Sequence, residues 1–279
     1  MSKKVAISAI HMTVAFMLCN ALYPQGSINQ YNNMPKTKME TGDELAVHPN
    51  ISMKKNDKLF HYNSVEAFIS GKLYDGNYTY KALLEHGDFG LAAAHKIDGE
   101  VTILDGKIYQ TKANGKTSEL KLKDRTPLAF VSDLSVDLTW TIDKTFTKET
   151  LEKHLKNRLK KTDYIYAIKI SGTFNTLKTR TYRPVLSQSY PEFSEVVKNQ
   201  QLFKIHNVIG SIVGFFVPPS LKGVNVPGFH FHFLSEDKKH GGHVLDLEID
   251  KALVEVGELK GYVVHFSEHQ NFQTMDANK

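Results

Sequence analysis

The amino-acid sequence predicts an α+β protein in which mostly antiparallel β-sheets outweigh a few short helices. Alternating apolar and polar runs recur along the chain, separated by turn dipeptides such as Asp98-Gly99 and Asp105-Gly106, a pattern typical of antiparallel hairpins. Only a few stretches carry the period of an amphipathic helix. With 279 residues, 41% of them hydrophobic, the chain is long enough for one large domain or two closely packed ones.

The N-terminus has the order of a secretory signal peptide, which we expect to span residues 1–21. Lys3 and Lys4 precede the apolar stretch Val5–Leu18, and small or polar residues follow up to Ala21. The apolar stretch is short for a membrane span, so no stable membrane association is expected once the signal is removed. The sequence therefore predicts export to the periplasm or the extracellular space.

Residues 22–57 are polar and lack a sustained period, which predicts a flexible leader before a folded body at residues 58–279. The body can form two closely packed subdomains. Cys19, the only cysteine, lies within the predicted signal peptide. A mature chain without cysteine suits an oxidising compartment and excludes disulfides and thiolate metal ligands.

Within the body, four short helices are expected where apolar residues recur on one helical face. They cover Ser64–Ser70, Tyr80–Glu85, Lys148–Lys160 and the residues after Pro191 up to Val197. Strands are expected where β-branched and aromatic residues lie between turn signals. In chain order they are Val101–Leu104, Lys107–Lys112, Leu128–Ser132, Ser135–Thr141, Ile165–Gly172, Leu177–Pro184, Phe203–Ile205, Gly210–Pro218, Phe229–Leu234, Gly242–Ile249 and Leu253–Leu259.

Charge and motifs exclude several classes of function. The formal net charge is +5, but basic and acidic residues are interspersed and no Lys/Arg block alternates with aromatics, so no nucleic-acid partner is expected. A Gly-rich phosphate loop is missing, which argues against nucleotide use. The nucleophile motif Gly-x-Ser-x-Gly is missing as well, so acyl transfer has no evident nucleophile.

Three histidines near the C-terminal end form the strongest chemical signal. His230 and His232 are separated by one residue, so a strand presents both imidazoles on one face and the neighbouring phenylalanines on the other. His243 follows the polar turn Ser235–Gly242, which is long enough to return the chain antiparallel beside the first strand. The spacing therefore predicts a site for one divalent metal ion.

Three neutral imidazoles leave coordination positions open, which is the arrangement of a catalytic rather than a structural zinc site. Nickel, manganese or iron would also accept these ligands. Each ring usually donates its second N–H to an oxygen, for which Asp246, Glu248 and backbone carbonyls are the candidates. His240 competes with His243 but is expected in a solvated turn. The remaining histidines considered are interpreted as ordinary polar-aromatic residues: His11, His48, His61, His154, His206 and His269.

Several longer runs are specific enough to indicate a family. They are LFHYNSVEAFISGKLYDGNYT, LLEHGDFGL, DGEVTILDGKIYQ, IKISGTFNTLKTRT, EVVKNQ, GSIVGFFVP and GVNVPGFHFHFLSEDKKHGGHVLDLEI. In this order, from about Leu59 to Glu258, they closely resemble α-acetolactate decarboxylase. The resemblance implies a mixed α/β architecture with a barrel-like β core, a homodimer, and 2-acetolactate (2-hydroxy-2-methyl-3-oxobutanoate) as the substrate, which is converted to acetoin and carbon dioxide.

The family's site residues map by motif onto this sequence. The resemblance implies zinc ligands at His230, His232 and His243, and catalytic residues at Arg180 in KTRT and Glu100 in the Asp-Gly-Glu turn. The metal would act as a Lewis acid that accepts the electron pair left by carbon dioxide. Arg180 would be a charge partner for the substrate, and Glu100 would supply or relay a proton if burial raises its pKa.

Two departures from the family pattern keep other readings open. The family has Gly-Thr-Phe where this chain has Ala92-Ala93-Ala94, so a hydroxyl is missing at Ala93. The family's second glutamate, from its C-terminal tail, has only a weak counterpart in Glu268. The alternatives are a non-catalytic metal- or ligand-binding module that retains the fold, and a zinc hydrolase that uses a metal-bound hydroxide.

Overall fold

The computed structural model describes the chain from Asp57 to Ser267 apart from three single positions, that is residues 57–161, 163–187, 189–222 and 224–267. The predicted signal peptide and nearly all of the predicted leader lie outside these ranges, as do Cys19 and Glu268. No helix in the described ranges is both long enough and apolar enough to cross a lipid bilayer.

One sheet has seven strands in the order β15-β1-β8-β3-β4-β5-β6. Their bounds are β1 Lys58–Tyr62, β3 Phe89–Ala93, β4 Glu100–Leu104, β5 Lys107–Thr111, β6 Thr117–Glu119, β8 Ala129–Ser132 and β15 Gly261–His265. Neighbours pair antiparallel except β1 and β15, which are parallel and join the two ends of the body. The predicted hairpin at Asp105-Gly106 is confirmed, since both turn residues have the positive φ that such a turn requires.

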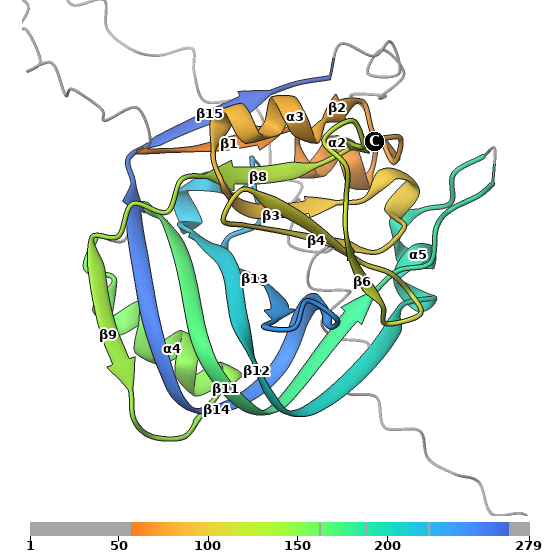
Figure 1. Ribbon diagram of the computed structural model, residues 1–279. Coiled ribbons are helices and arrows are strands. Elements are labelled where there is room, and N and C mark those ends of the chain that lie inside the picture. The colour runs from red at the N-terminus through yellow and green to blue at the C-terminus, as the bar shows by residue number, and fades with distance from the viewer. Residues whose placement is uncertain (1–56, 162, 188, 223, 268–279) are drawn as a thin grey trace, which may run out of the picture. The chain divides into compact units, whose positions relative to one another are not determined.

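The second sheet contains the longest strands, in the order β10-β14-β11-β12-β13, with β9 also paired to β14. The bounds are β9 Leu138–Ile142, β10 Phe146–Thr147, β11 Ile165–Thr181, β12 Gln201–Val217, β13 Gly228–Ser235 and β14 Gly241–Leu259. β13 also pairs with the beginning of β14, so the sheet curls into a partly closed ring. This ring, seen in Figure 1, agrees with the predicted barrel-like core.

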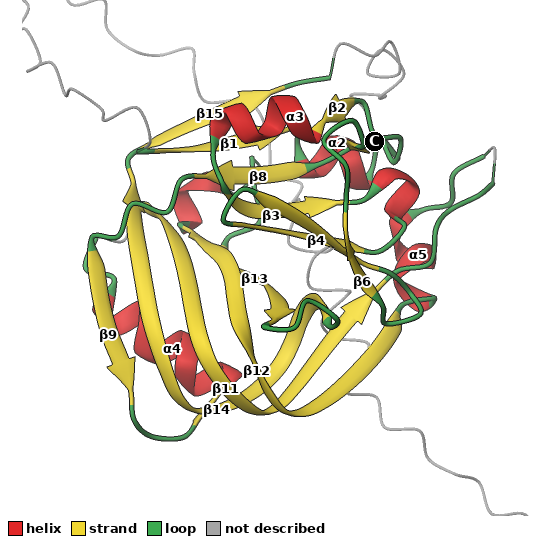
Figure 2. Cartoon of the chain, viewed as in Figure 1, coloured by secondary structure: helices red, strands yellow, loops and turns green. Residues whose placement is uncertain are grey.

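The helices are few and short, as predicted, and strands dominate the fold (Figure 2). They are α2 Val65–Ile69, α3 Tyr80–Leu83, α4 Lys148–Arg158 and α5 Phe193–Lys198, with 3-10 turns η2 Leu84–His86, η3 His95–Ile97 and η4 Pro219–Leu221. A small pair of strands, β2 Tyr78–Thr79 and β7 Arg125–Thr126, stands apart from the two sheets. The α+β class with mostly antiparallel sheets is therefore confirmed.

Three apolar clusters show how these layers pack. The first lies between the long-stranded sheet and α4, and it includes Leu151 and Leu155 of the helix and Phe231 and Phe233 of β13. The second lies between the two sheets. The third covers the outer side of the seven-stranded sheet beneath α3. Because side chains alternate along a strand, the residues flanking Phe231 on β13 point away from α4 and toward the other sheet.

Three predicted breaks between strands were wrong. The expected breaks within β11, β12 and β14 do not occur, and each of these strands runs on for 17 to 19 residues. Polar runs such as Gly172–Thr176 suggested breaks, but hydrogen bonding to a neighbour on each side keeps β11 extended. The irregularity appears instead as register shifts near Phe174 and Lys178.

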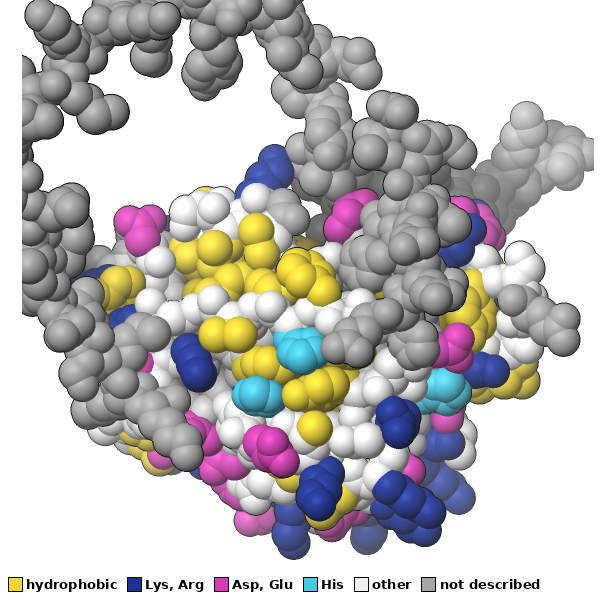
Figure 3. All heavy atoms as spheres, turned by 90° about the horizontal axis from the view of Figure 1, so that it is seen from above, with side chains coloured by type: hydrophobic (Ala, Val, Ile, Leu, Met, Phe, Trp, Pro, Cys, Tyr) yellow, Lys and Arg dark blue, Asp and Glu magenta, His cyan; other side chains and the backbone are white. Residues whose placement is uncertain are grey.

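The face seen in Figure 3 mixes apolar side chains, histidines and charged groups of both signs. Val263 and Phe266 are large apolar residues exposed at the C-terminal end of the described body, with exposed fractions of 39% and 56%. No single sign of charge dominates this face.

Candidate metal centre

The three predicted ligand residues lie together on two adjacent strands. His230 and His232 are on β13, and His243, near the start of β14, is directly opposite His232. On the other side of β13, His230 and His232 pair with Phe215 and Val213 of β12, which belong to the apolar cluster between the sheets. The histidine side chains therefore face the seven-stranded sheet.

The imidazole rings surround one point. The ring centroids are 5.3 Å apart for His230 and His232, 5.0 Å for His230 and His243, and 5.5 Å for His232 and His243. One nitrogen of each ring lies within 4.8 Å of a nitrogen of each of the others. This group can hold one metal ion with small side-chain adjustments.

Glycine at position 242 lets the two strands meet at this place. Its φ is +116°, and an added Cβ would lie 2.8 Å from the Arg180 carbonyl oxygen on β11. A larger residue would therefore push β14 away from β11 next to His243. At Gly241 an added Cβ would lie 2.4 Å from the Thr111 hydroxyl oxygen, so the hairpin is also closely packed against the seven-stranded sheet.

Burial keeps all three imidazoles neutral. It lowers the pKa of His230 to about 4, with a smaller contribution from the positive charge of Arg180. Burial likewise lowers the pKa values of His232 and His243 well below the ordinary value, and the positive charge of Arg180 acts in the same direction on both, whereas the hydrogen bond to Val101 opposes the shift at His232. Neutral imidazoles have the free nitrogen lone pairs that a metal ion requires.

A hydrogen bond from the other sheet orients His232. Its Nδ1 lies 2.9 Å from the Val101 carbonyl oxygen of β4, so Nδ1 carries the proton and donates it. Nε2 is then an unprotonated acceptor, and it is buried without a hydrogen-bond partner among the described residues. An unpaired buried lone pair beside two other imidazoles is suited to bind a metal ion, so these residues fit such an ion.

Among the candidate oxygens for the second N–H, a backbone carbonyl serves for His232. Asp246 instead accepts a hydrogen bond from the Leu247 backbone N–H, and the Glu248 carboxylate lies 3.4 Å from the Asn175 side-chain amide. His240, the competitor to His243, is exposed in the turn between the strands, as expected.

Glu100 lies beside the triad, at the start of β4. Its carboxylate oxygen is 3.5 Å from His232 Nε2, and the residue is 8% exposed. Burial raises the pKa of Glu100 to about 7, although the positive charge of Arg180 opposes the shift. Near neutral pH this carboxyl group is therefore divided between its protonated and ionised forms, a state suited to proton transfer.

Arg180 reaches the same place from β11, where it is directly opposite His243. Its guanidinium carbon lies 5.1 Å from the centre of the Tyr182 ring, and its Nε is buried with no hydrogen-bond partner in the described ranges. A permanently charged group with an unused buried donor is suited to bind an anionic ligand.

Other predicted features have clear positions. Ala93 on β3 pairs with Glu100, so the position at which the resemblance implied a threonine lies next to the acidic group. Tyr74 and Phe89 are buried core residues, as expected. Sequence reasoning did not single out Val101, whose backbone oxygen fixes the His232 tautomer, because no side-chain pattern identifies a carbonyl acceptor.

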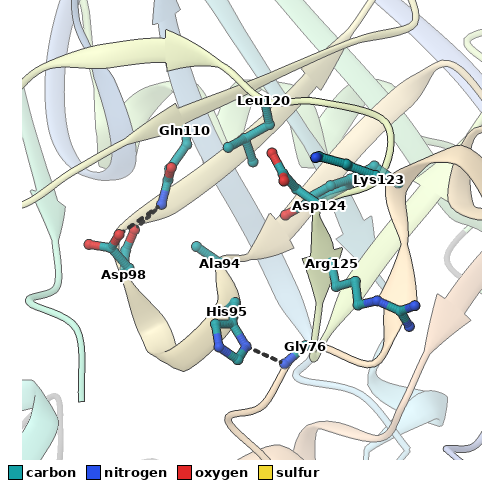
Figure 4. A pocket seen from close by; sticks show the side chains of 10 residues that line it. Gly76, Ala94, His95, Asp98, Gln110, Leu120, Lys123, Asp124 and Arg125 are labelled. Carbon is teal, nitrogen blue, oxygen red and sulfur yellow. Dashed lines mark hydrogen bonds between the residues drawn. The ribbon is translucent and has the colours of Figure 1, made fainter. Parts of the chain in front are cut away.

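A separate cavity of about 340 Å³ lies away from the triad and is lined in part by Tyr80 and Ala94 of the outer apolar cluster. Figure 4 shows its polar lining, which includes residues of both charges: His95, Asp98, Gln110, Lys123, Asp124 and Arg125. Asp98 accepts hydrogen bonds from the Gln110 amide through its side chain and backbone oxygens. None of the five predicted site residues lines this cavity.

Comparison with known proteins identifies the family of the chain. Residues 59–279 match the family model described as alpha-acetolactate decarboxylase. The chain is 34% identical to the alpha-acetolactate decarboxylase of Brevibacillus brevis, with 88% of this chain and 84% of that protein covered. It is 35% identical to the Methanosarcina mazei protein of the same name, with coverage of 78% and 76%.

Among solved structures, the alpha-acetolactate decarboxylase of Bacillus subtilis strain 168 superimposes with a TM-score of 0.76. It is 29% identical in sequence, and the match covers 80% of this chain and 94% of the other. Fold and sequence thus lead to one conclusion. The chain belongs to the α-acetolactate decarboxylase family.

Proposed function

We infer that this protein is a carbon–carbon lyase that converts 2-acetolactate to acetoin and carbon dioxide. The observation that carries the proposal is the convergence of three neutral imidazoles with Glu100 and Arg180 between the sheets, in a chain of this family. In the reaction the bond between the carboxylate carbon and C2 breaks, carbon dioxide leaves, and one proton is added to the remaining fragment.

His230, His232 and His243 would hold the metal ion, which we propose is zinc. Three nitrogen ligands leave room for substrate oxygens, and the histidine tautomer set by Val101 directs Nε2 of His232 toward the ion position. When bound, a divalent ion supplies Lewis-acid stabilisation for the electron pair that remains after carbon dioxide departs.

Arg180 orients the substrate. Acetolactate carries one negative charge, and the Arg180 side chain is a permanent cation whose buried Nε needs an acceptor. An anion bound beside His243 would accept a hydrogen bond from this Nε–H. Substrate binding would therefore also provide the partner that the buried donor lacks. This arrangement holds the scissile bond in one orientation.

Glu100 donates the proton that the reaction consumes. The reaction consumes one proton, and a carboxyl group whose pKa is raised to about 7 is partly protonated under ordinary conditions. Its carboxylate lies 3.5 Å from a ring nitrogen of the ligand His232 and therefore close to a bound substrate. Glu100 thus donates a proton to the carbanionic fragment and is reprotonated from solvent.

The decisive experiment measures acetoin formation by the purified protein with zinc and with a chelator. We expect turnover of acetolactate with zinc, its loss with chelator, and its return when zinc is added back. His232→Ala should abolish turnover and most zinc binding, because it removes a central ligand, whereas His240→Ala in the exposed turn should change neither. Full activity in protein shown to be free of metal would exclude this mechanism.

The same assay separates the alternative functions. A non-catalytic binding module would hold about one ion per chain and release no acetoin. A zinc hydrolase would cleave esters or peptides and leave acetolactate unchanged. Ala93 is the specific reason to test turnover. It places a methyl group beside Glu100, at a position where the family resemblance implies a threonine hydroxyl.

We further propose that residues 1–21 direct export and are removed, that residues 22–57 form a leader, and that the body acts as a homodimer. The order of basic, apolar and small residues at the N-terminus supports export. The family resemblance supports the dimer. Mass spectrometry of the secreted protein would identify the mature N-terminus. Light scattering would give the mass of the assembly, and a monomer at all concentrations would contradict the dimer.

A further inference from the structure

His61 on β1 is a buried histidine with one ring nitrogen unaccounted for. The residue is fully buried, and its Nε2 has no hydrogen-bond partner in the described part of the chain. Leu59, two residues before it, belongs to the apolar cluster between the sheets, whereas Phe60 belongs to the outer cluster. Alternation along β1 therefore turns the His61 ring inward, toward the sheet that carries the metal ligands.

The other ring nitrogen is held in a chain of hydrogen bonds. His61 Nδ1 is hydrogen-bonded to the Tyr262 hydroxyl of β15, and the Asn225 side-chain amide donates to the same hydroxyl oxygen over 3.1 Å. Since that oxygen accepts from Asn225, its own proton is free to be donated to His61 Nδ1. The opposite arrangement would leave the tyrosine proton without an acceptor among the described residues. The chain therefore places the imidazole proton on Nε2.

Burial keeps this ring neutral, since it lowers the pKa of His61 to about 3. At neutral pH the ring thus presents one N–H donor, on Nε2, for which residues 57–267, as far as they are described, provide no acceptor. An unpaired buried donor destabilises the folded protein, because it has lost its hydrogen bonds to water, so it calls for an explanation.

The His61 ring lies close to the candidate metal centre. Phe130 of β8 is directly opposite His61, and the two rings stack with centroids 4.3 Å apart. The same Phe130 ring meets the ligand His230 edge-on at 5.9 Å. His61 therefore lies one aromatic ring away from the metal centre, on the sheet opposite the one that carries the triad and Arg180, as β1 and β13 in Figure 1 indicate.

We propose that His61 is a substrate-binding residue whose Nε2–H donates a hydrogen bond to the carboxylate of the bound α-hydroxy-β-keto acid. This inference rests on the proposed function. The hydroxyl and ketone oxygens are the groups suited to the metal centre, which leaves the carboxylate as the strongest remaining acceptor. A neutral donor positions the carboxylate but binds it less tightly than a second cation beside Arg180 would. It therefore stabilises the charged carboxylate less, and the conversion of the carboxylate to neutral carbon dioxide is opposed less strongly.

The test uses two substitutions that differ in one property. His61→Phe keeps a ring that can stack on Phe130 but removes the donor, and His61→Gln keeps an amide N–H near the place of Nε2. Loss of a hydrogen bond to a charged group predicts a rise in KM for acetolactate of roughly 10- to 100-fold in His61→Phe. We expect kcat to stay within about threefold, and His61→Gln to recover most of the KM. The matched control is His154→Phe, on α4 at the far side of the other sheet.

Binding measurements identify the acceptor without turnover. Calorimetric titration of the zinc-loaded proteins with 2-hydroxy-2-methylpropanoate, which has a carboxylate, should show affinity weakened at least about tenfold in His61→Phe and restored in His61→Gln. In the same titration acetoin, which has no carboxylate, should bind both variants with the affinity it has for the unchanged protein, within about twofold. Equal weakening for acetoin, unchanged affinity for the acid, or no rescue by glutamine would overturn the proposal.

Two results keep this inference distinct from the proposed function. If the unchanged protein does not decarboxylate acetolactate, the function is wrong, and the titrations still report whether His61 binds carboxylates. If it does decarboxylate acetolactate but His61→Phe binds the acid normally, the role of His61 is wrong. Should His61→Phe fold poorly, Tyr262→Phe removes the hydroxyl that fixes the tautomer and should weaken acid binding several-fold without changing zinc content; unchanged acid binding would then refute the proposal.

Discussion

Glu100 and His61 are both buried titratable side chains on the seven-stranded sheet, and burial shifts their pKa values in opposite directions. It raises the pKa of Glu100 to about 7 and lowers that of His61 to about 3. Both shifts have the same cause, because a poorly hydrated environment disfavours whichever form is charged. Near the centre the protein therefore offers a carboxyl group able to release a proton and an imidazole unable to gain one.

Glu100→Gln should separate proton transfer from metal binding. Glutamine has nearly the same size but no acidic proton, so we expect kcat for acetoin formation to fall on the order of 100- to 1,000-fold. Zinc content should be unchanged, because Glu100 is not one of the three ligand residues. Glu119→Gln, an exposed position on β6 of the same sheet, is the control. A variant with more than a tenth of normal turnover would remove Glu100 from the proton step.

His61 predicts a pH dependence of stability. Between pH 6.5 and about 3 the unfolded chain binds a proton at this residue that the folded protein does not, so stability falls as the pH decreases through this window. For a residue with these two pKa values, the loss between pH 8 and pH 5 is about 2 kcal/mol.

Urea unfolding of the metal-free protein at pH 8 and pH 5 measures this effect. His61→Gln cannot titrate, so its free energy of unfolding should decline by about 2 kcal/mol less than that of the unchanged protein over the same range. The triad histidines also titrate, but they contribute equally to both proteins. Identical pH dependence in the two would mean that His61 has the same pKa in the folded protein as in the unfolded chain.

At the scale of the elements, the β13–β14 hairpin determines whether the three imidazoles meet. Its strands pair at His232 and His243, and β14 then leaves β13 to pair along β11. Gly242 lies at this branch, with φ +116° and no space for a Cβ next to the Arg180 carbonyl. The position of His243 thus depends on a backbone conformation that favours glycine.

Gly242→Ala should move His243 and weaken metal binding. We expect a loss of about 1–3 kcal/mol in stability and a clear reduction of zinc affinity, measured by competition with a chromophoric chelator. Gly106→Ala is the matched control, because Gly106 also has a positive φ, +71°, but its nearest neighbour is a Cβ at 4.0 Å. This control should lose stability but keep its zinc affinity. Equal zinc affinity in both variants would show that β14 tolerates the displacement.

At the scale of the whole body, the candidate centre lies where the two sheets meet. The long-stranded sheet contributes the triad and Arg180, whereas the seven-stranded sheet contributes Glu100 and the Val101 carbonyl. A metal ion bound only by the folded arrangement stabilises that arrangement by mass action.

Removal of the metal should therefore lower the thermal stability of the body. At a free zinc concentration 100 times the dissociation constant, binding contributes about 2.7 kcal/mol, which corresponds to a Tm shift of roughly 5–10 °C for a protein of this size. Scanning calorimetry with and without chelator measures the shift. His232→Ala should melt at one temperature under both conditions, and a chelator effect in that variant would place the ion elsewhere.

How far sequence reasoning succeeded depended on the range of the interactions involved. The Asp105-Gly106 hairpin and the α4 helix were predicted because turn chemistry and helical period are local. The continuity of β11 and β14 was not, because hydrogen bonds to strands distant in sequence sustain their polar stretches. The surroundings of His61 were not predicted either, since its partner Tyr262 is 201 positions away.

The amino-acid sequence by itself determined that three imidazoles lie side by side, because strand alternation and one short turn are enough to bring them to one face. The family resemblance also implied that Glu100 and Arg180 belong to the same site. Only the tertiary structure decided that both side chains reach the triad, that a Val101 carbonyl selects the His232 tautomer, and that His61 stacks beside the centre. These relations depend on how two sheets face each other, which long-range packing sets and no local pattern records.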